Sequence, residues 1–215
     1  MKTITKSYQS ERVIQKSRFL SYLEPMTSLE EMEQRHKELR KIHRKANHVC
    51  YAYRFGMAQP VGHFSDDGEP SQTAGLPMYQ VLEGEDMTDV AVYVVRYFGG
   101  IKLGTGGLVR AYSQAVKDVI EQAAFQDIYR RYKLELNYSY SYHNQVQNLL
   151  TDVASREPIY REDIHWTVYL EDEQLIEQLI DLTEGSIKIK QYGQVFIASD
   201  KRGTLELGGH DETID

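Results

Sequence analysis

Strict alternation of apolar and polar residues marks the second half of the chain. From Tyr132 to Tyr142 every even position is apolar or aromatic and every odd position is polar. A period of two predicts a strand with one buried face. Further apolar stretches follow at 146–153 (helix), 159–160 and 164–170 (strands), 175–180 (helix) and 187–197 (strand or hairpin). This β-α-β-β-α-β order predicts a ferredoxin-like domain, in which both helices cover one face of an antiparallel sheet.

The first half contains segments whose apolar residues have helical spacing and segments that are apolar almost throughout. Residues 89–98 are nearly all apolar, which predicts a strand buried on both faces. Ser28 is suited to cap a helix that runs to about Lys45, because its acidic residues come early and its basic residues late. The other expected elements are two strands within 3–25, a strand at 48–55, a loop at 56–69, a helix at 70–82 interrupted at Gly75 and Pro77, and an amphipathic helix at 108–123.

The charge of the chain changes where this pattern changes. Residues 1–128 carry 16 Lys and Arg against 16 Asp and Glu. Residues 129–215 carry 9 against 16, and so hold the whole net charge of −7. We therefore predict an α+β protein with two domains, at 1–128 and 129–200. A polar tail is expected at 201–215, in which 204–207 is a candidate edge strand.

Composition indicates the cellular setting. Hydrophobic residues make up 41% of the 215 residues, which predicts a packed core rather than disorder. No apolar run approaches the roughly 20 residues of a membrane span, and the opening segment MKTITKSYQSER lacks the apolar centre of a secretory signal. The single cysteine, Cys50, excludes an internal disulfide framework and fits a reducing compartment. We expect a soluble cytoplasmic protein that does not interact with membranes.

A glycine-rich turn, GGIKLGTGG at Gly99–Gly107, separates the most apolar strand from the long helix. A helix N-terminus offers unpaired N–H groups to an anion, and Lys102 and Arg110 add two cations. A Walker A loop is excluded because Thr105 stands where it needs Lys, and a dinucleotide loop because Val109 stands where it needs Gly. Anion binding and a purely structural role in a tight turn remain as alternatives.

Three carboxylates are close together in the segment SDDGEPSQTAGLPM. Carboxylates at this spacing can hold Mg²⁺ with a substrate phosphate, but they also serve as turn and helix-cap residues. A third chemistry would use Cys50 as a nucleophile, since His48 lies on the same side of the predicted strand. A lone cysteine in such a segment is more often a small core residue. The residues of the loop that we single out are Ser65, Asp66, Asp67, Glu69 and Thr73.

Four blocks of the sequence resemble the Impact (YigZ) family, in the family's own order, across residues 17–127. They are SRFL at 17–20, HVCYAYR at 48–54, SDDGEPSQTAGLPM at 65–78 and VVRYFGGIKLGTGGLVRAYSQA at 94–115. The remainder resembles the small C-terminal domain of the bacterial members. The sequence departs from the family pattern at Gln72, where Gly is expected, and at Leu76, where a basic residue is common.

The resemblance implies an N-terminal domain like the second domain of a small-subunit ribosomal protein and domain IV of elongation factor G. It implies a C-terminal domain like domain V of that factor. The eukaryotic members of the family that it resembles look like regulators of translation under amino-acid starvation, and the resemblance does not carry their partner over to this chain. By position, the resemblance implies a surface for nucleic acid or the ribosome formed by Arg96, Lys102, Gly104, Thr105, Gly106, Gly107 and Arg110.

These observations favour a non-catalytic cytoplasmic factor that binds RNA or the ribosome and regulates translation or a stress response. Neither a cofactor nor a metal is expected for that role. Two alternatives stay open. One is a hydrolase, possibly metal-dependent, that uses Asp66, Asp67 and Glu69. The other is a protein-interaction module with a protein partner.

Overall fold

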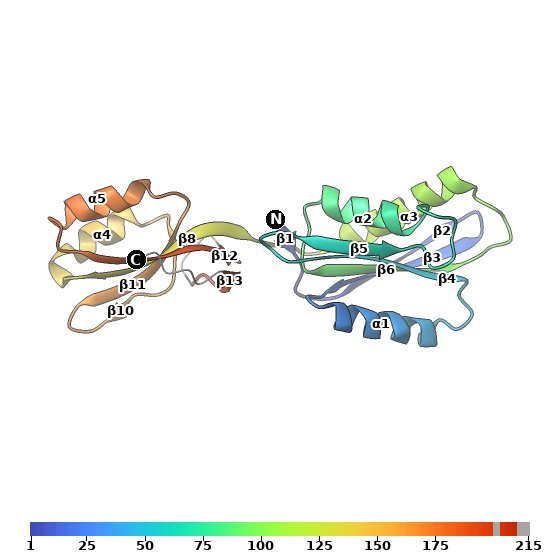
Figure 1. The fold of residues 1–215 in the computed structure, drawn as a ribbon, viewed down its shortest axis with the longest axis horizontal. Helices are drawn as coiled ribbons and strands as arrows, with labels where there is room; N and C mark the ends of the chain where they lie inside the picture. Colours follow the sequence, from blue (N-terminus) through green and yellow to red (C-terminus); the bar gives the residue numbers. More distant parts are fainter. Residues whose placement is uncertain (200–202, 210–215) are drawn as a thin grey trace. The chain divides into compact units, whose positions relative to one another are not determined.

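A computed structural model describes residues 1–199 and 203–209 of the chain (Figure 1). The chain divides into two compact units, Met1–Gln126 and Asp127–Asp215, here called unit 1 and unit 2. Both units combine helices with sheets, so the chain is a mixed α and β protein. The more specific resemblance to ribosomal protein and elongation factor domains stays a prediction.

Unit 1 is built on a five-stranded antiparallel sheet with the order β2-β3-β6-β4-β5. The central strand is β6, and its run of apolar residues is buried on both faces, as its sequence predicts. Two short strands, β1 and β7, stand outside this sheet. The strands are β1 (Lys2–Thr3), β2 (Tyr8–Ile14), β3 (Ser17–Pro25), β4 (His48–Phe55), β5 (Val61–Ser65), β6 (Val90–Tyr97) and β7 (Gln126–Asp127).

Helices cover both faces of this sheet (Figure 1). One face packs on α1 (Leu29–Ile42), and the other on α2 (Gly75–Gly84) and α3 (Thr105–Ile120). Side chains alternate along β6, so Val92 and Val94 join the core under α2 and α3, whereas their neighbours join the core under α1. Each face of the sheet therefore has its own hydrophobic core.

Unit 2 follows the predicted β-α-β-β-α-β order and forms an antiparallel sheet with the order β10-β11-β8-β12-β13, while β9 pairs with β11. Both α4 and α5 lie on one face of the sheet (Figure 1), where they pack against Leu134, Leu136, Trp166 and Val168. The elements are β8 (Tyr129–Tyr138), the 3-10 helix η1 (Tyr140–Tyr142), α4 (His143–Leu149), β9 (Ala154–Ser155), β10 (Ile159–Tyr160), β11 (Ile164–Leu170), α5 (Gln174–Leu182), β12 (Lys188–Ile197) and β13 (Glu206–Gly209).

One predicted strand of unit 2 is wrong in extent, and another is confirmed in part. The strand expected to reach Tyr142 ends at Tyr138, because Ser139 accepts a backbone N–H from Ser141 and begins the 3-10 helix. The candidate edge strand expected within the tail, at 204–207, is confirmed in part as β13, which pairs with β12 at the edge of the sheet. The rest of that tail, at 201–202 and 210–215, lies outside the described residues.

Two elements of unit 1 also differ from the prediction. The segment expected to be a loop at 56–69 contains β5, which pairs with β4 at the edge of the sheet. The helix expected at 70–82, with a break or restart at Gly75, has only the part that begins at Gly75. Its start is set by Asp66, whose carboxylate accepts the N–H groups of Ala74 and Gly75.

Candidate functional site

The glycine turn, Gly99–Gly107, joins β6 to α3, and three of its glycines have a structural reason. A Cβ on Gly99 would lie 2.0 Å from the backbone carbon of Lys16, so only glycine lets the turn pack against the β2–β3 connection. Gly100 and Gly104 have φ values of +86° and +70°, which lie in the left-handed region that favours glycine. The structural alternative therefore explains part of the turn.

Gly106 has no such reason. A Cβ there would meet only Nη1 of Arg110, at 3.7 Å. Gly106 belongs to the first turn of α3, where glycine weakens a helix by roughly 1 kcal/mol relative to alanine. The N-cap residue of this helix is Gly104, and no side chain caps it. The first turn of α3 is thus left open to solvent at a point where the fold does not require a glycine.

The cations predicted for this site fall into two groups. Lys102 and Arg110 are exposed, and within the described part of the chain neither takes part in an ion pair. Arg96 is buried instead, with its Nη1 2.6 Å from Oε1 of Glu69. Its predicted place on the binding surface is wrong. Arg96 lies two positions after Val94 on β6, so both side chains point to the same face of the sheet, into the core under α3.

The open first turn and the two free cations form one surface, which we call the α3 surface. Its exposed members are Lys102, Gly104, Thr105, Gly106 and Arg110, and Gly107 is half-buried. A groove of about 560 Å³ runs from it along the helix, lined by Leu103, Val109, Arg110, Gln114 and Lys117 of the turn and α3, and by Ile14 and Gln15 at the end of β2.

The first carboxylate of the predicted loop is a helix cap. Oδ1 of Asp66 accepts hydrogen bonds from the N–H groups of Ala74 at 2.9 Å and Gly75 at 2.8 Å, and Oδ2 accepts one from Gln72 at 2.7 Å. Gln72 has φ +61°, a left-handed conformation that favours glycine, the residue that the family resemblance leads us to expect there. A Cβ on Gly75 would lie 2.8 Å from the backbone of Ser65, so β5 and α2 meet closely at this cap.

Asp67 and the two hydroxyls of the loop are also bonded internally. The carboxylate of Asp67 accepts hydrogen bonds from the Arg40 guanidinium and the Val49 N–H. Oγ of Ser65 accepts the N–H of Asp67 at 3.2 Å, and Oγ1 of Thr73 donates to the carbonyl of Pro70 at 2.6 Å. These bonds hold the loop against β4 and α1.

Glu69 is buried beneath α3. Its Oε1 accepts hydrogen bonds from Arg96 at 2.6 Å and from the Tyr112 hydroxyl at 2.7 Å, and its Oε2 lies 3.7 Å from Nε2 of His48. The Tyr112 hydroxyl lies 3.4 Å from Sγ of Cys50, and burial raises the pKa values of both groups far above their ordinary range. Cys50 is therefore held as a neutral thiol, which is not the state of a nucleophile.

The carboxylate loop and the glycine turn are thus neighbours with different roles. Glu69 bonds to β6 and α3, the two elements that the turn connects. All three carboxylates have internal partners, and no group of three or more metal-ligating side chains occurs among the described residues. Arg40 and Tyr112 also belong to this cluster, and no local sequence signal indicates them, because their hydrogen-bond partners in the loop are 27 and 43 positions away. In the described part of the chain, no helix is long and apolar enough to cross a membrane.

Comparison with known sequences finds similar proteins across most of the chain. A model of the Impact N-terminal domain matches residues 15–120. IMPACT family member YvyE of Bacillus subtilis (strain 168) is 32% identical over 194 residues, which are 88% of this chain and 89% of that protein. IMPACT family member YigZ of Escherichia coli (strain K12) is 42% identical over 116 residues, which are 53% of this chain and 56% of that protein.

Similar solved structures exist as well. A crystal structure described as that of a hypothetical protein is 31% identical, with a TM-score of 0.56, and the match covers 87% of this chain and 95% of that one. A structure of the two-domain translational regulator Yih1 is 29% identical and matches 57% of this chain and 47% of that one. Its TM-score of 0.33 is too low to establish a common fold.

Proposed function

Because this chain belongs to the Impact family, we propose that it is a non-catalytic factor that binds RNA through the α3 surface. The observation that carries this proposal is the open N-terminus of α3 with two exposed cations beside it, Lys102 and Arg110, which form no ion pair with any described residue. The neighbouring carboxylates do not compete for these cations, since each is bonded inside the fold.

A phosphate group fits this surface for three physical reasons. The free N–H groups and the dipole at a helix N-terminus favour an anion. The missing side chain at Gly106 lets a phosphate oxygen approach the backbone closely. Lys102 and Arg110 add charge that a phosphodiester chain neutralises with release of counterions.

An aromatic side chain next to the turn favours RNA with unpaired bases. Phe98 directly precedes the turn and is 45% exposed. The guanidinium of Arg96 lies 5.5 Å from the centre of its ring and supports one side of it. Bases of single-stranded nucleic acid stack on exposed aromatic rings of this kind. Arg96 would then act through Phe98 rather than by touching phosphate.

The biological role in this proposal comes from the family. We infer that the RNA belongs to the ribosome, that binding regulates translation or a stress response, and that the protein acts in the cytoplasm. The family resemblance supports the ribosomal part, and the one buried free cysteine fits a reducing compartment. The hydrolase alternative loses its basis, because it requires free carboxylates at Asp66, Asp67 and Glu69.

The test is the salt dependence of RNA binding, measured by fluorescence anisotropy with a labelled single-stranded RNA. Replacing Lys102 and Arg110 together with alanine should weaken binding. It should also reduce the slope of log K against log salt concentration by about 1.4, since each phosphate contact contributes about 0.7 on a single strand. The matched control replaces Lys41 and Lys45, which are exposed near the end of α1, and should leave the slope unchanged. An equal slope in all three proteins would overturn the proposal.

A protein partner is the second candidate, and the exposed apolar residues next to the turn favour it. Phe98 is 45% exposed and Ile101 is 44% exposed, on the same turn. A protein partner would bury both side chains. Replacing both with serine should then abolish a partner's binding even after nuclease treatment. RNA binding would instead lose affinity without losing its salt slope.

A further inference from the structure

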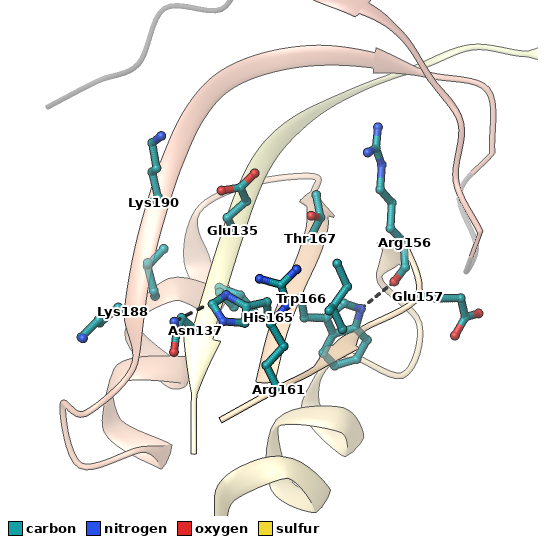
Figure 2. Close-up of a pocket in the computed structure, with 13 residues that line it drawn as sticks. Glu135, Asn137, Arg156, Glu157, Arg161, His165, Trp166, Thr167, Lys188 and Lys190 are labelled. Carbon is teal, nitrogen blue, oxygen red and sulfur yellow. Dashed lines mark hydrogen bonds between the residues drawn. The ribbon is translucent and has the colours of Figure 1, made fainter. Parts of the chain in front are cut away.

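The open face of the sheet in unit 2 carries a hollow of about 500 Å³ that the function proposed above does not use (Figure 2). Glu135 and Asn137 face it from β8, while Leu134 and Leu136 alternate with them and enter the core under α4 and α5. The hollow therefore lies on the face of the sheet away from its helices. Its volume lies within the range of small-molecule sites.

The strand register arranges polar side chains across this face in a row. His165 of β11 stands opposite Asn137 of β8, which stands opposite Lys188 of β12. Figure 2 shows Arg161, from the turn between β10 and β11, extending toward His165 at one end of this row. The row thus has a cation near each end, but in Figure 2 only the Arg161 side chain extends toward the row, and that of Lys188 points away from Asn137.

The donors of this row lack matching acceptors. The Nδ2 amide of Asn137 lies 3.5 Å from Nδ1 of His165, and donation to that nitrogen leaves Nε2 of the neutral ring as an N–H donor. Arg161 and Lys188 offer only donors, and no ion pair of either occurs among the described residues. An oxyanion supplies the acceptors that such a set of donors requires.

Positive charge is concentrated in this hollow, although the sequence of unit 2 is acidic as a whole. Residues 129–215 hold nine Lys and Arg, and four of them line the hollow, namely Arg156, Arg161, Lys188 and Lys190. Only two of the 16 carboxylates of that segment do so, Glu135 and Glu157. Glu135 accepts a hydrogen bond from the Tyr192 hydroxyl at 2.7 Å, which leaves less of its charge for the cations.

We propose that this hollow binds a small organic phosphomonoester, with its phosphate on Arg161, His165 and Asn137 and with the Lys188 side chain turning inward to join them. A compact anion is favoured over a long one because a polyanion would extend over the acidic remainder of unit 2. Ile159 stands opposite His165 on the edge strand and is 54% exposed, so it offers an apolar wall to the organic part. This proposal is independent of RNA binding by the α3 surface.

The test uses phenyl phosphate as the probe and amide NMR spectra of the full chain as the readout. Saturable shifts at His165, Asn137 and Lys188 are expected, with a Kd of about 1–10 mM, a range common for small fragments. Arg161→Gln and Lys188→Gln should each raise this Kd by about tenfold, because each removes a charge-assisted contact. Arg130→Gln removes an exposed cation of the same unit outside the hollow and should leave the Kd unchanged.

Three further arms distinguish the ligand classes. Inorganic phosphate should shift the same amides with a higher Kd, and benzoate should bind more weakly than phenyl phosphate. Tighter binding of benzoate would overturn the phosphate assignment. Tighter binding of a single-stranded RNA at the same residues would overturn the small-molecule assignment. Absence of saturable shifts, or equal Kd values in wild type and the Arg161→Gln and Lys188→Gln variants, would overturn the site itself.

Discussion

Replacing Glu69 with alanine tests whether the carboxylate loop is structural. The side chains of Glu69 and Arg96 are only 3% and 5% exposed, and they form a 2.6 Å ion pair. Removal of one partner leaves the other charge buried without compensation, which typically costs about 3–5 kcal/mol. The Tyr112 hydroxyl loses its acceptor as well. We therefore expect Glu69→Ala to lose at least about 3 kcal/mol of unfolding free energy, a large share of the 5–15 kcal/mol of a typical domain.

The assay is urea unfolding followed by far-ultraviolet circular dichroism. Trp166, the single tryptophan, lies in unit 2, so its fluorescence reports separately on that unit. The matched control is Glu11→Ala, which breaks the ion pair between Glu11 and Arg18. The side chains of these two residues are 44% and 51% exposed, respectively. Such a pair contributes less than about 1 kcal/mol. If Glu69→Ala is no more destabilising than Glu11→Ala, the structural role assigned to the loop is wrong.

Three further predictions concern single positions in unit 1. Gln72→Gly should raise the unfolding free energy by about 0.5–1 kcal/mol in urea titrations, because glycine relieves the left-handed strain; a loss would contradict this. Gly106→Ala should stabilise α3 by up to about 1 kcal/mol and still weaken RNA binding. Gly99→Ala should instead destabilise the fold, because its Cβ clashes with the β2–β3 connection. Equal effects of the two substitutions on the unfolding free energy would refute the distinction between these glycines. The hydrogen bond from Arg12 lowers the pKa of Asp118, so its stabilising effect is present above the ordinary value of 3.8 and is lost as the pH falls through the lowered pKa. Asp118→Asn should therefore reduce the loss of unfolding free energy at acidic pH. An unchanged loss at acidic pH would contradict the role given to Asp118.

Local sequence signals predicted most of the helices and strands. Ser28 caps α1 by accepting the N–H of Glu31, as the acidic first turn suggested. The apolar run of β6 lies at the centre of its sheet, with both faces buried. The strand β5 was missed because VGHFS has no apolar alternation, and its pairing is set by β4 rather than by its own residues.

The candidate site was harder to predict because its partners are far apart in the chain. Asp66, Asp67 and Glu69 look alike in the sequence, yet one caps a helix, one binds Arg40 and one is buried with Arg96. Nothing local distinguishes these roles. The burial of Arg96 could have been predicted. Side chains alternate between the two faces of a strand, so Arg96 points to the same face as Val94, two positions before it.

The most direct test of RNA binding by the α3 surface is an amide NMR titration of the full chain with a short single-stranded RNA at low salt. We expect the largest shifts at Gly104, Thr105, Gly106 and Gly107. The shifts should reverse as salt is raised, because the contacts are to phosphates. Shifts that map to α1 or to the hollow in unit 2, with those four amides unmoved, would contradict it.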